Sequence, residues 1–115
     1  MAPHNRWRIQ VRQAHIDHSA DFFTKMDPYV VFETCGQKWR TTTAKNMGKN
    51  PRWKHQRMKL AVEGELDDEV LLTIKIYDDD LFRDELLCEA TFPLKDLLIE
   101  GGAIENVTLF HKGEE

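Results

Sequence analysis

The sequence predicts an all-β protein, an antiparallel β-sandwich of seven to eight strands. Several short segments alternate apolar and polar residues with a period of two, which is the pattern of a strand with one buried face. Turn residues separate these segments at intervals of roughly a dozen positions, and helical periodicity is almost absent. Because the chain has 115 residues, it has room for one hydrophobic core. We therefore expect one domain of two packed layers.

The expected strands follow one another along the whole chain. They cover residues 6–12, 29–32, 38–43, 53–62, 70–76, 86–94 and 105–110. In the first of them, Trp7, Ile9 and Val11 alternate with polar residues. Pro28 favours an extended residue before it and so marks the start of the second. One helical turn is expected over residues 95–99.

The segment 53–62 breaks its own alternation. Met58, Leu60 and Val62 share one parity, whereas Trp53 has the other. A β-bulge near residues 54–56 would bring all four side chains to the core side. The same bulge would turn the neighbouring cations away from the core, where they would be costly without partners.

Basic and acidic residues are distributed unevenly. Residues 34–62 contain eight Lys or Arg and no Asp or Glu, which leaves eight basic residues against all 20 acidic ones elsewhere. This asymmetry favours an anionic partner, either a membrane surface or nucleic acid, although lysines exposed for solubility give the same pattern. Aromatic residues other than Trp39 and Trp53 are not interleaved with the basic ones, so we expect no nucleic-acid partner.

Two acidic loops follow strands of the same type. The first runs from Asp21 to Asp27, and the second, from Asp78 to Glu85, has five carboxylates in eight positions. In a sandwich both loops can emerge at one end, where their oxygens would form a cup for a hard cation such as calcium. An ordinary solvated acidic turn is the alternative interpretation of the second loop.

Large apolar side chains lie within or beside these acidic loops. They are Phe22, Phe23, Met26, Leu81 and Phe82. Loop tips usually face water, so these side chains are expected to insert into a membrane or a partner.

Catalysis and zinc binding have little support in the sequence. No Ser, Cys or His arrangement resembles a nucleophile with its base, so we do not expect an enzyme. His15, Asp17 and His18 could ligate zinc, but three such residues in one loop more often form a polar turn. The N-terminus has no apolar signal core and no stretch is long enough to span a membrane, so we expect a cytoplasmic protein.

Four motifs occur in order along the chain. They are Asp21 with Asp27-Pro28-Tyr29-Val30, Lys45 through Asn50-Pro51-Arg52-Trp53, Ile76-Tyr77-Asp78-Asp79-Asp80, and Leu87-Cys88-Glu89-Ala90. Together they resemble a C2 domain. The resemblance implies a single C2 domain over residues 1–115, with a core at about 6–111. It also implies a C2-type Greek key in the permuted (type II) topology, with the last strand missing or truncated.

The resemblance further implies calcium-dependent docking on acidic phospholipid, either phosphatidylserine or a phosphoinositide. About one or two Ca²⁺ ions would lie between the two acidic loops, and the protein would move to membranes when calcium rises. The residues that match the ligand aspartates of the family are Asp21, Asp27, Asp78 and Asp80. The second loop is about one residue shorter than the longer form in the family, so either Asp84 or Glu85 is the fifth ligand.

A basic pair is also carried over from the family. Lys38 and Arg40 match an alternating pair that holds phosphoinositide headgroups in some C2 domains, and Arg57 and Lys59 are added to it. The alternative function is a calcium-independent protein-interaction module that uses the basic strands or the sheet edge left open by the missing strand. The same edge could join two copies of the chain into a dimer.

Overall fold

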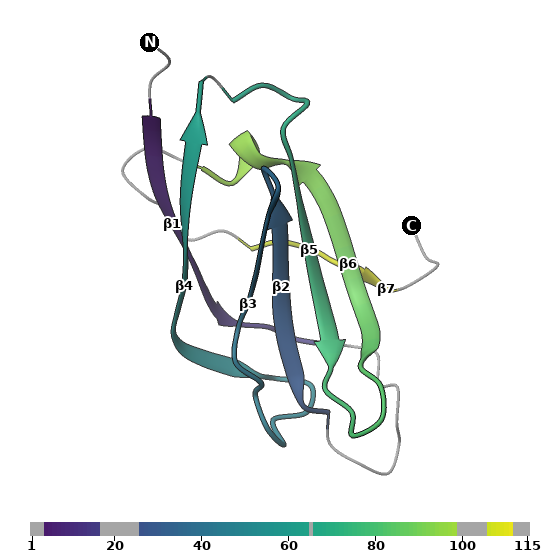
Figure 1. The fold of residues 1–115 in the computed structure, drawn as a ribbon. Coiled ribbons are helices and arrows are strands. Elements are labelled where there is room, and N and C mark those ends of the chain that lie inside the picture. Colours follow the sequence, from purple (N-terminus) through teal and green to yellow (C-terminus); the bar gives the residue numbers. More distant parts are fainter. Residues whose placement is uncertain (1–3, 17–25, 65, 99–105, 112–115) are drawn as a thin grey trace.

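Two antiparallel sheets pack face to face (Figure 1). The computed structural model describes residues 4–16, 26–64, 66–98 and 106–111. One sheet pairs β1 (His4–Gln13) with β4 (Arg52–Glu63). The other has the order β3-β2-β5-β6-β7, with β2 (Pro28–Thr34), β3 (Gln37–Arg40), β5 (Leu71–Asp78), β6 (Glu85–Pro93) and the two-residue β7 (Phe110–His111). The expected β-sandwich is therefore confirmed.

Most strand boundaries lie within two residues of the expected ones, and three elements differ by more. Strand β3 stops at Arg40 because Thr41 turns back onto β2. The Thr41 N–H donates to the Val30 carbonyl at 2.9 Å, and the Thr41 hydroxyl accepts the Val30 N–H at 2.9 Å. The expected helical turn is a 3-10 helix, η1 (Leu94–Asp96), and the last strand is limited to Phe110–His111 among the described residues.

The hydrophobic core lies between the two sheets. Its buried strand residues are Ile9 of β1, Trp53, Met58, Leu60 and Val62 of β4, Val30 and Phe32 of β2, Leu72, Ile74 and Ile76 of β5, and Leu87 of β6. Apart from Trp53, these residues have a single parity on each strand, so the residues between them face outward. This alternation decides which face of the sandwich each charged strand residue occupies.

The predicted bulge in β4 is confirmed. Val11 lies opposite Gln56, but Gln13 lies opposite Arg52, so β4 has extra residues between these two pairs. His55 in this bulge has a φ of 56°, which is a left-handed conformation. As a result, Trp53 and Met58 are both buried despite their opposite parity.

Three connections gather at one end of the sandwich, the lower end in Figure 1. They are the end of the β1–β2 connection, the β3–β4 loop (41–51) and the β5–β6 loop (79–84). Backbone bonds join them, because Gly48 N–H donates to the Met26 carbonyl and Asp79 N–H donates to the Asp27 carbonyl, both at 3.0 Å. The sequence expectation that the two acidic loops share one end therefore holds for the described part of the first loop.

Strand β1 has a described strand on one edge only, because it pairs with β4 alone. No eighth strand lies beside it among the described residues. The indole N–H of Trp7 on β1 is buried and has no acceptor in this part of the chain. None of the described helical residues belongs to a helix long and apolar enough to cross a membrane.

Replacing His55 by glycine should stabilise the fold. A side chain in the left-handed region costs about 1–2 kcal/mol, and glycine lacks that cost but loses more backbone entropy. We expect His55→Gly to raise the free energy of unfolding by about 0.5–1 kcal/mol in urea denaturation. The matched control is Gln56→Gly in the same bulge, which should lower it, and a loss of stability in His55→Gly would contradict the assigned bulge.

Candidate cation and membrane site

Asp27 and Asp78 meet at the loop end of the sandwich. Strands β2 and β5 pair so that Pro28 lies opposite Asp78. The Asp27 N–H donates to Oδ1 of Asp78 at 2.9 Å, and Oδ1 of Asp27 accepts the Asn46 N–H at 2.6 Å. The Asp27 backbone thus joins the first acidic loop to a carboxylate of the second, and the third loop contributes a backbone donor that the sequence pattern did not reveal.

The remaining carboxylates of the 79–84 loop accept hydrogen bonds from the chain itself. Oδ2 of Asp79 accepts the Thr43 hydroxyl at 2.8 Å. Oδ1 of Asp80 accepts the Phe82 N–H at 3.4 Å within its own loop, and the Asp80 side chain is exposed. This loop is therefore organised by local donors.

Tyr29 is a site residue that the sequence analysis missed. Its hydroxyl donates to Oδ2 of Asp84 at 2.5 Å, and its ring stacks on Tyr77 with centroids 5.4 Å apart. The Arg40 guanidinium lies over the same ring, with Cζ 3.6 Å from the centroid. The sequence did contain a signal for this role. Tyr29 alternates with the core residues of β2, so its side chain must lie on the outer face of the sheet, beside the loop.

The electrostatic environments of Asp78 and Asp84 differ. Burial raises the pKa of Asp78, and the neighbouring Asp27, Asp80 and Glu85 carboxylates raise it further, while the Asp27 N–H opposes them. The Tyr29 hydroxyl, by contrast, lowers the pKa of Asp84. Burial and the bond to Asp84 raise the pKa of Tyr29 to about 12, so this hydroxyl is a permanent donor near neutral pH.

The donor set suits calcium in its chemistry, because hard cations take carboxylate oxygens. Within the described ranges, however, no three His, Cys, Asp or Glu side chains form a group that could hold a metal ion. Asp27 and Asp78 are close, whereas Asp21 lies outside the described residues. The calcium expectation is therefore supported by residue type and by one contact, and it remains a prediction.

The described residues do not contain the full set of ligands for the alternative zinc site either. Nδ1 of His15 lies 2.7 Å from Oδ1 of Asn50, while Asp17 and His18 fall outside the described residues.

Two of the five expected membrane-inserting side chains are fully displayed at the loop end. Leu81 is 90% exposed and Phe82 is 93% exposed. Met26 was expected with them, but this expectation is wrong because its side chain is 2% exposed and belongs to the core. Phe22 and Phe23 lie outside the described residues.

The four expected basic residues do not form one patch. Lys38 and Arg40 lie on the outer face of the five-stranded sheet, because Trp39 between them packs on Phe32 at the core. Arg57 and Lys59 alternate with the buried residues of β4 and so lie on the outer face of the other sheet. The two pairs therefore lie on opposite outer faces of the sandwich. The sequence could not show this, because alternation within one strand does not tell which sheet that strand joins.

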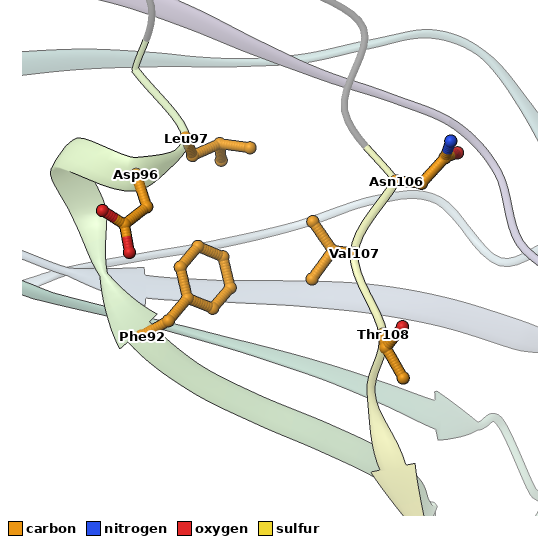
Figure 2. A pocket seen from close by; sticks show the side chains of 6 residues that line it. All are labelled: Phe92, Asp96, Leu97, Asn106, Val107 and Thr108. Carbon is orange, nitrogen blue, oxygen red and sulfur yellow. The ribbon is translucent and has the colours of Figure 1, made fainter.

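A shallow hollow of about 250 Å³ lies beside η1 and the end of β6 (Figure 2). Phe92 and Val107 face each other across it, and Asp96, Leu97, Asn106 and Thr108 complete the lining. It is smaller than typical ligand pockets and open to solvent. On β6, burial raises the pKa of the Cys88 thiol to about 11, which keeps it protonated near neutral pH.

Comparison with known proteins gives a consistent result. A family model described as C2 domain matches residues 5–109. The 16 kDa phloem protein 2 of Arabidopsis thaliana is 32% identical over 100 residues, and elicitor-responsive protein 1 of Oryza sativa subsp. japonica is 37% identical over 82. These matches cover 86% and 67% of this chain, which spans 65% and 49% of the two relatives. A solved structure, a C2 domain-containing protein from a putative elicitor-responsive gene, has a TM-score of 0.72 and 27% identity, covering 99% of this chain and 83% of its own.

Replacing Asp78 by asparagine should stabilise the protein without calcium. The raised pKa of Asp78 means that folding disfavours its charged form. The charge therefore lowers the free energy of unfolding, and this loss reaches its full size above the pKa of Asp78 in the folded protein. Asparagine removes the charge and keeps an oxygen for the Asp27 N–H. In chelator at neutral pH, Asp78→Asn should melt a few degrees above the parent protein. The difference should shrink with acidification and vanish below the ordinary pKa of 3.8. Asp96→Asn is the matched control, and a lower melting temperature of Asp78→Asn would contradict the prediction.

Proposed function

Because the chain belongs to the C2 domain family, we propose that it docks on membranes rich in acidic phospholipid when calcium binds at its acidic loops. C2 domains are modules that bind membranes or proteins. The observation that carries the proposal is that Leu81 and Phe82 are almost fully exposed beside the contact between Asp27 and Asp78. A binding role without catalysis follows from this proposal.

Oxygen atoms from the two acidic loops would hold the cation. Asp27, Asp78 and Asp80 supply carboxylates at the loop end, and Asp21 is the further candidate from the first loop. A bound calcium ion supplies positive charge and open coordination positions for a lipid phosphate oxygen. The hydrogen bonds from the Asp27 N–H to Asp78 and from the Asn46 N–H to Asp27 would orient this site.

Weak contributions must add to a useful affinity. Burying Leu81 and Phe82 contributes about 1.5–3 kcal/mol each. Two basic residues near an anionic surface add about 1 kcal/mol each, so the total of about 5–8 kcal/mol corresponds to millimolar to micromolar binding. The carboxylates of the acidic loops would repel an anionic surface and reduce this affinity. Docking is therefore favourable only when a cation neutralises these loops, which supports calcium dependence.

The basic contribution is assigned to the outer face of the β1–β4 sheet. Lys59 lies opposite Arg8, and Arg57 lies opposite Gln10, in the strand register. All four side chains are exposed. We propose that this face, rather than the one with Lys38 and Arg40, contacts anionic headgroups, including those of phosphoinositides.

The second candidate is a calcium-independent protein-interaction module. It is supported by the internal hydrogen bonds that the carboxylates of Asp27, Asp79 and Asp84 accept. The single described partner of β1 also suits an added strand from another protein or from a second copy. Vesicle binding separates this candidate from the first.

Vesicle co-sedimentation tests the calcium-dependent proposal. The chain should bind phosphatidylserine vesicles in calcium and not in chelator, and the double change Asp78→Asn with Asp80→Asn should abolish binding. Phe82→Ala should bind about 10- to 100-fold more weakly, as expected from its lost burial. Asp67→Asn with Asp68→Asn removes the same charge from a distant turn and should bind normally. Equal binding in chelator would contradict the calcium dependence, and no vesicle binding in either condition would favour the second candidate.

The location of the headgroup contact has its own test. Arg57→Gln with Lys59→Gln should weaken binding to vesicles containing a phosphoinositide by about 30-fold, because two contributions of about 1 kcal/mol are lost. The loss should diminish in high salt. Lys38→Gln, on the opposite face, should have little effect. If Lys38→Gln weakened binding as much as the double variant, the assignment to the β1–β4 sheet would be wrong.

A further inference from the structure

One guanidinium organises two carboxylates of the 79–84 loop. The Arg40 side chain covers the ring of Tyr29, and the Tyr29 hydroxyl donates to Oδ2 of Asp84. On the other side, Nη2 of Arg40 donates to Oγ1 of Thr43 at 3.0 Å, and Thr43 in turn donates to Oδ2 of Asp79 at 2.8 Å. We call these five residues the Arg40 clamp.

The clamp also orients backbone groups of the loop. Oδ1 of Asp84 accepts the Asp80 N–H at 3.2 Å, so both oxygens of this carboxylate are occupied. The Asp79 N–H donates to the Asp27 carbonyl at 3.0 Å. Arg40 is itself fixed, because its Nε donates to the Thr41 carbonyl at 2.9 Å. These contacts attach the loop to the outer face of the five-stranded sheet without a cation.

The side chain of Glu85 lies on the opposite side of the chain from that of its neighbour Asp84. Glu85 lies directly across from Asp78 in the β5–β6 register. Asp78 shares the parity of the buried Ile76 on β5. The β5–β6 register shifts between Ile76 and Tyr77, which brings the buried Leu87 and, two residues before it, Glu85 to the same side, so Glu85 and Asp78 are directed toward the space between the sheets. The Glu85 side chain is exposed and has no hydrogen bond or ion pair within the described residues. Glu85 is therefore available, whereas Asp84 is not.

We propose that Asp79 and Asp84 are positioning residues held by Arg40, and that Glu85, not Asp84, completes the cation site with Asp78. The assignment of Glu85 rests on the proposed calcium-dependent function, whereas the clamp does not. If Asp84 turned toward a cation, the Tyr29 hydroxyl would lose its acceptor, and Tyr29 is only 6% exposed. Buried hydroxyl groups are rarely left without a partner. Recruitment of Glu85 breaks no contact in the described residues.

Calcium titration by isothermal calorimetry tests the assignment of Glu85. Glu85→Gln should weaken calcium binding by about tenfold or more, because one ligand charge is removed. Asp84→Asn should change it by less than about threefold, since an indirect effect through the loop is small. An equal or larger loss in Asp84→Asn would overturn the assignment. Absence of calcium binding by the parent protein would overturn both this assignment and the proposed function.

Amide hydrogen exchange in chelator tests the clamp independently of calcium. Tyr29→Phe and Arg40→Gln should accelerate exchange of the Asp80 amide by about tenfold, because its acceptor Asp84 is released. Tyr77→Phe is the matched control, since it removes a hydroxyl from the same stacked ring pair and leaves the Asp84 bond in place. Thr43→Val should accelerate the Asp79 amide, and Thr43→Ser, which keeps the hydroxyl, should restore the parent rate. Unchanged exchange in Tyr29→Phe would overturn the clamp even if calcium binds.

Discussion

The register between β2 and β5 is the constraint on which the rest of the structure depends. Val30 and Phe32 lie opposite Ile76 and Ile74, and all four are buried between the sheets. Because side chains alternate along a strand, a slip of one residue would expose this whole set. The same register brings Asp27 to Asp78 and aligns Tyr29 with Tyr77 on the outer face. Core packing therefore positions the acidic loops.

The charge distribution has two different roles in the folded protein. The outward cations of β1 and β4 face solvent on one sheet, where they are available to an anionic surface. Arg40 belongs to the same basic stretch of sequence, but on the outer face of the other sheet it supports the acidic loop by stacking on Tyr29 and donating to Thr43. A guanidinium suits this role because it is planar and offers several donors at fixed angles. A run of basic residues thus splits into a surface component and a structural one.

Much of the fold could be predicted because strand alternation is a local property. The break in parity between Trp53 and Met58 was enough to place the bulge, since a buried tryptophan leaves few other solutions. The fate of Met26 could not be predicted in this way. Its immediate sequence neighbours are the charged Lys25 and Asp27, yet its carbonyl accepts the Gly48 N–H and its side chain fills the core. A contact between residues so distant in the chain has no local signal.

The sequence by itself determined the β-sandwich, the exposed acidic loop with its apolar tip, and membership of the C2 domain family, because each depends on residue types at short spacing. Only the tertiary structure decided that Lys38 and Arg40 lie on the face opposite Arg57 and Lys59, since that depends on which sheet each strand joins. It also distinguished two adjacent carboxylates. Asp84 faces the Tyr29 hydroxyl and Glu85 faces the side of Asp78, because neighbouring residues at a strand end point in opposite directions.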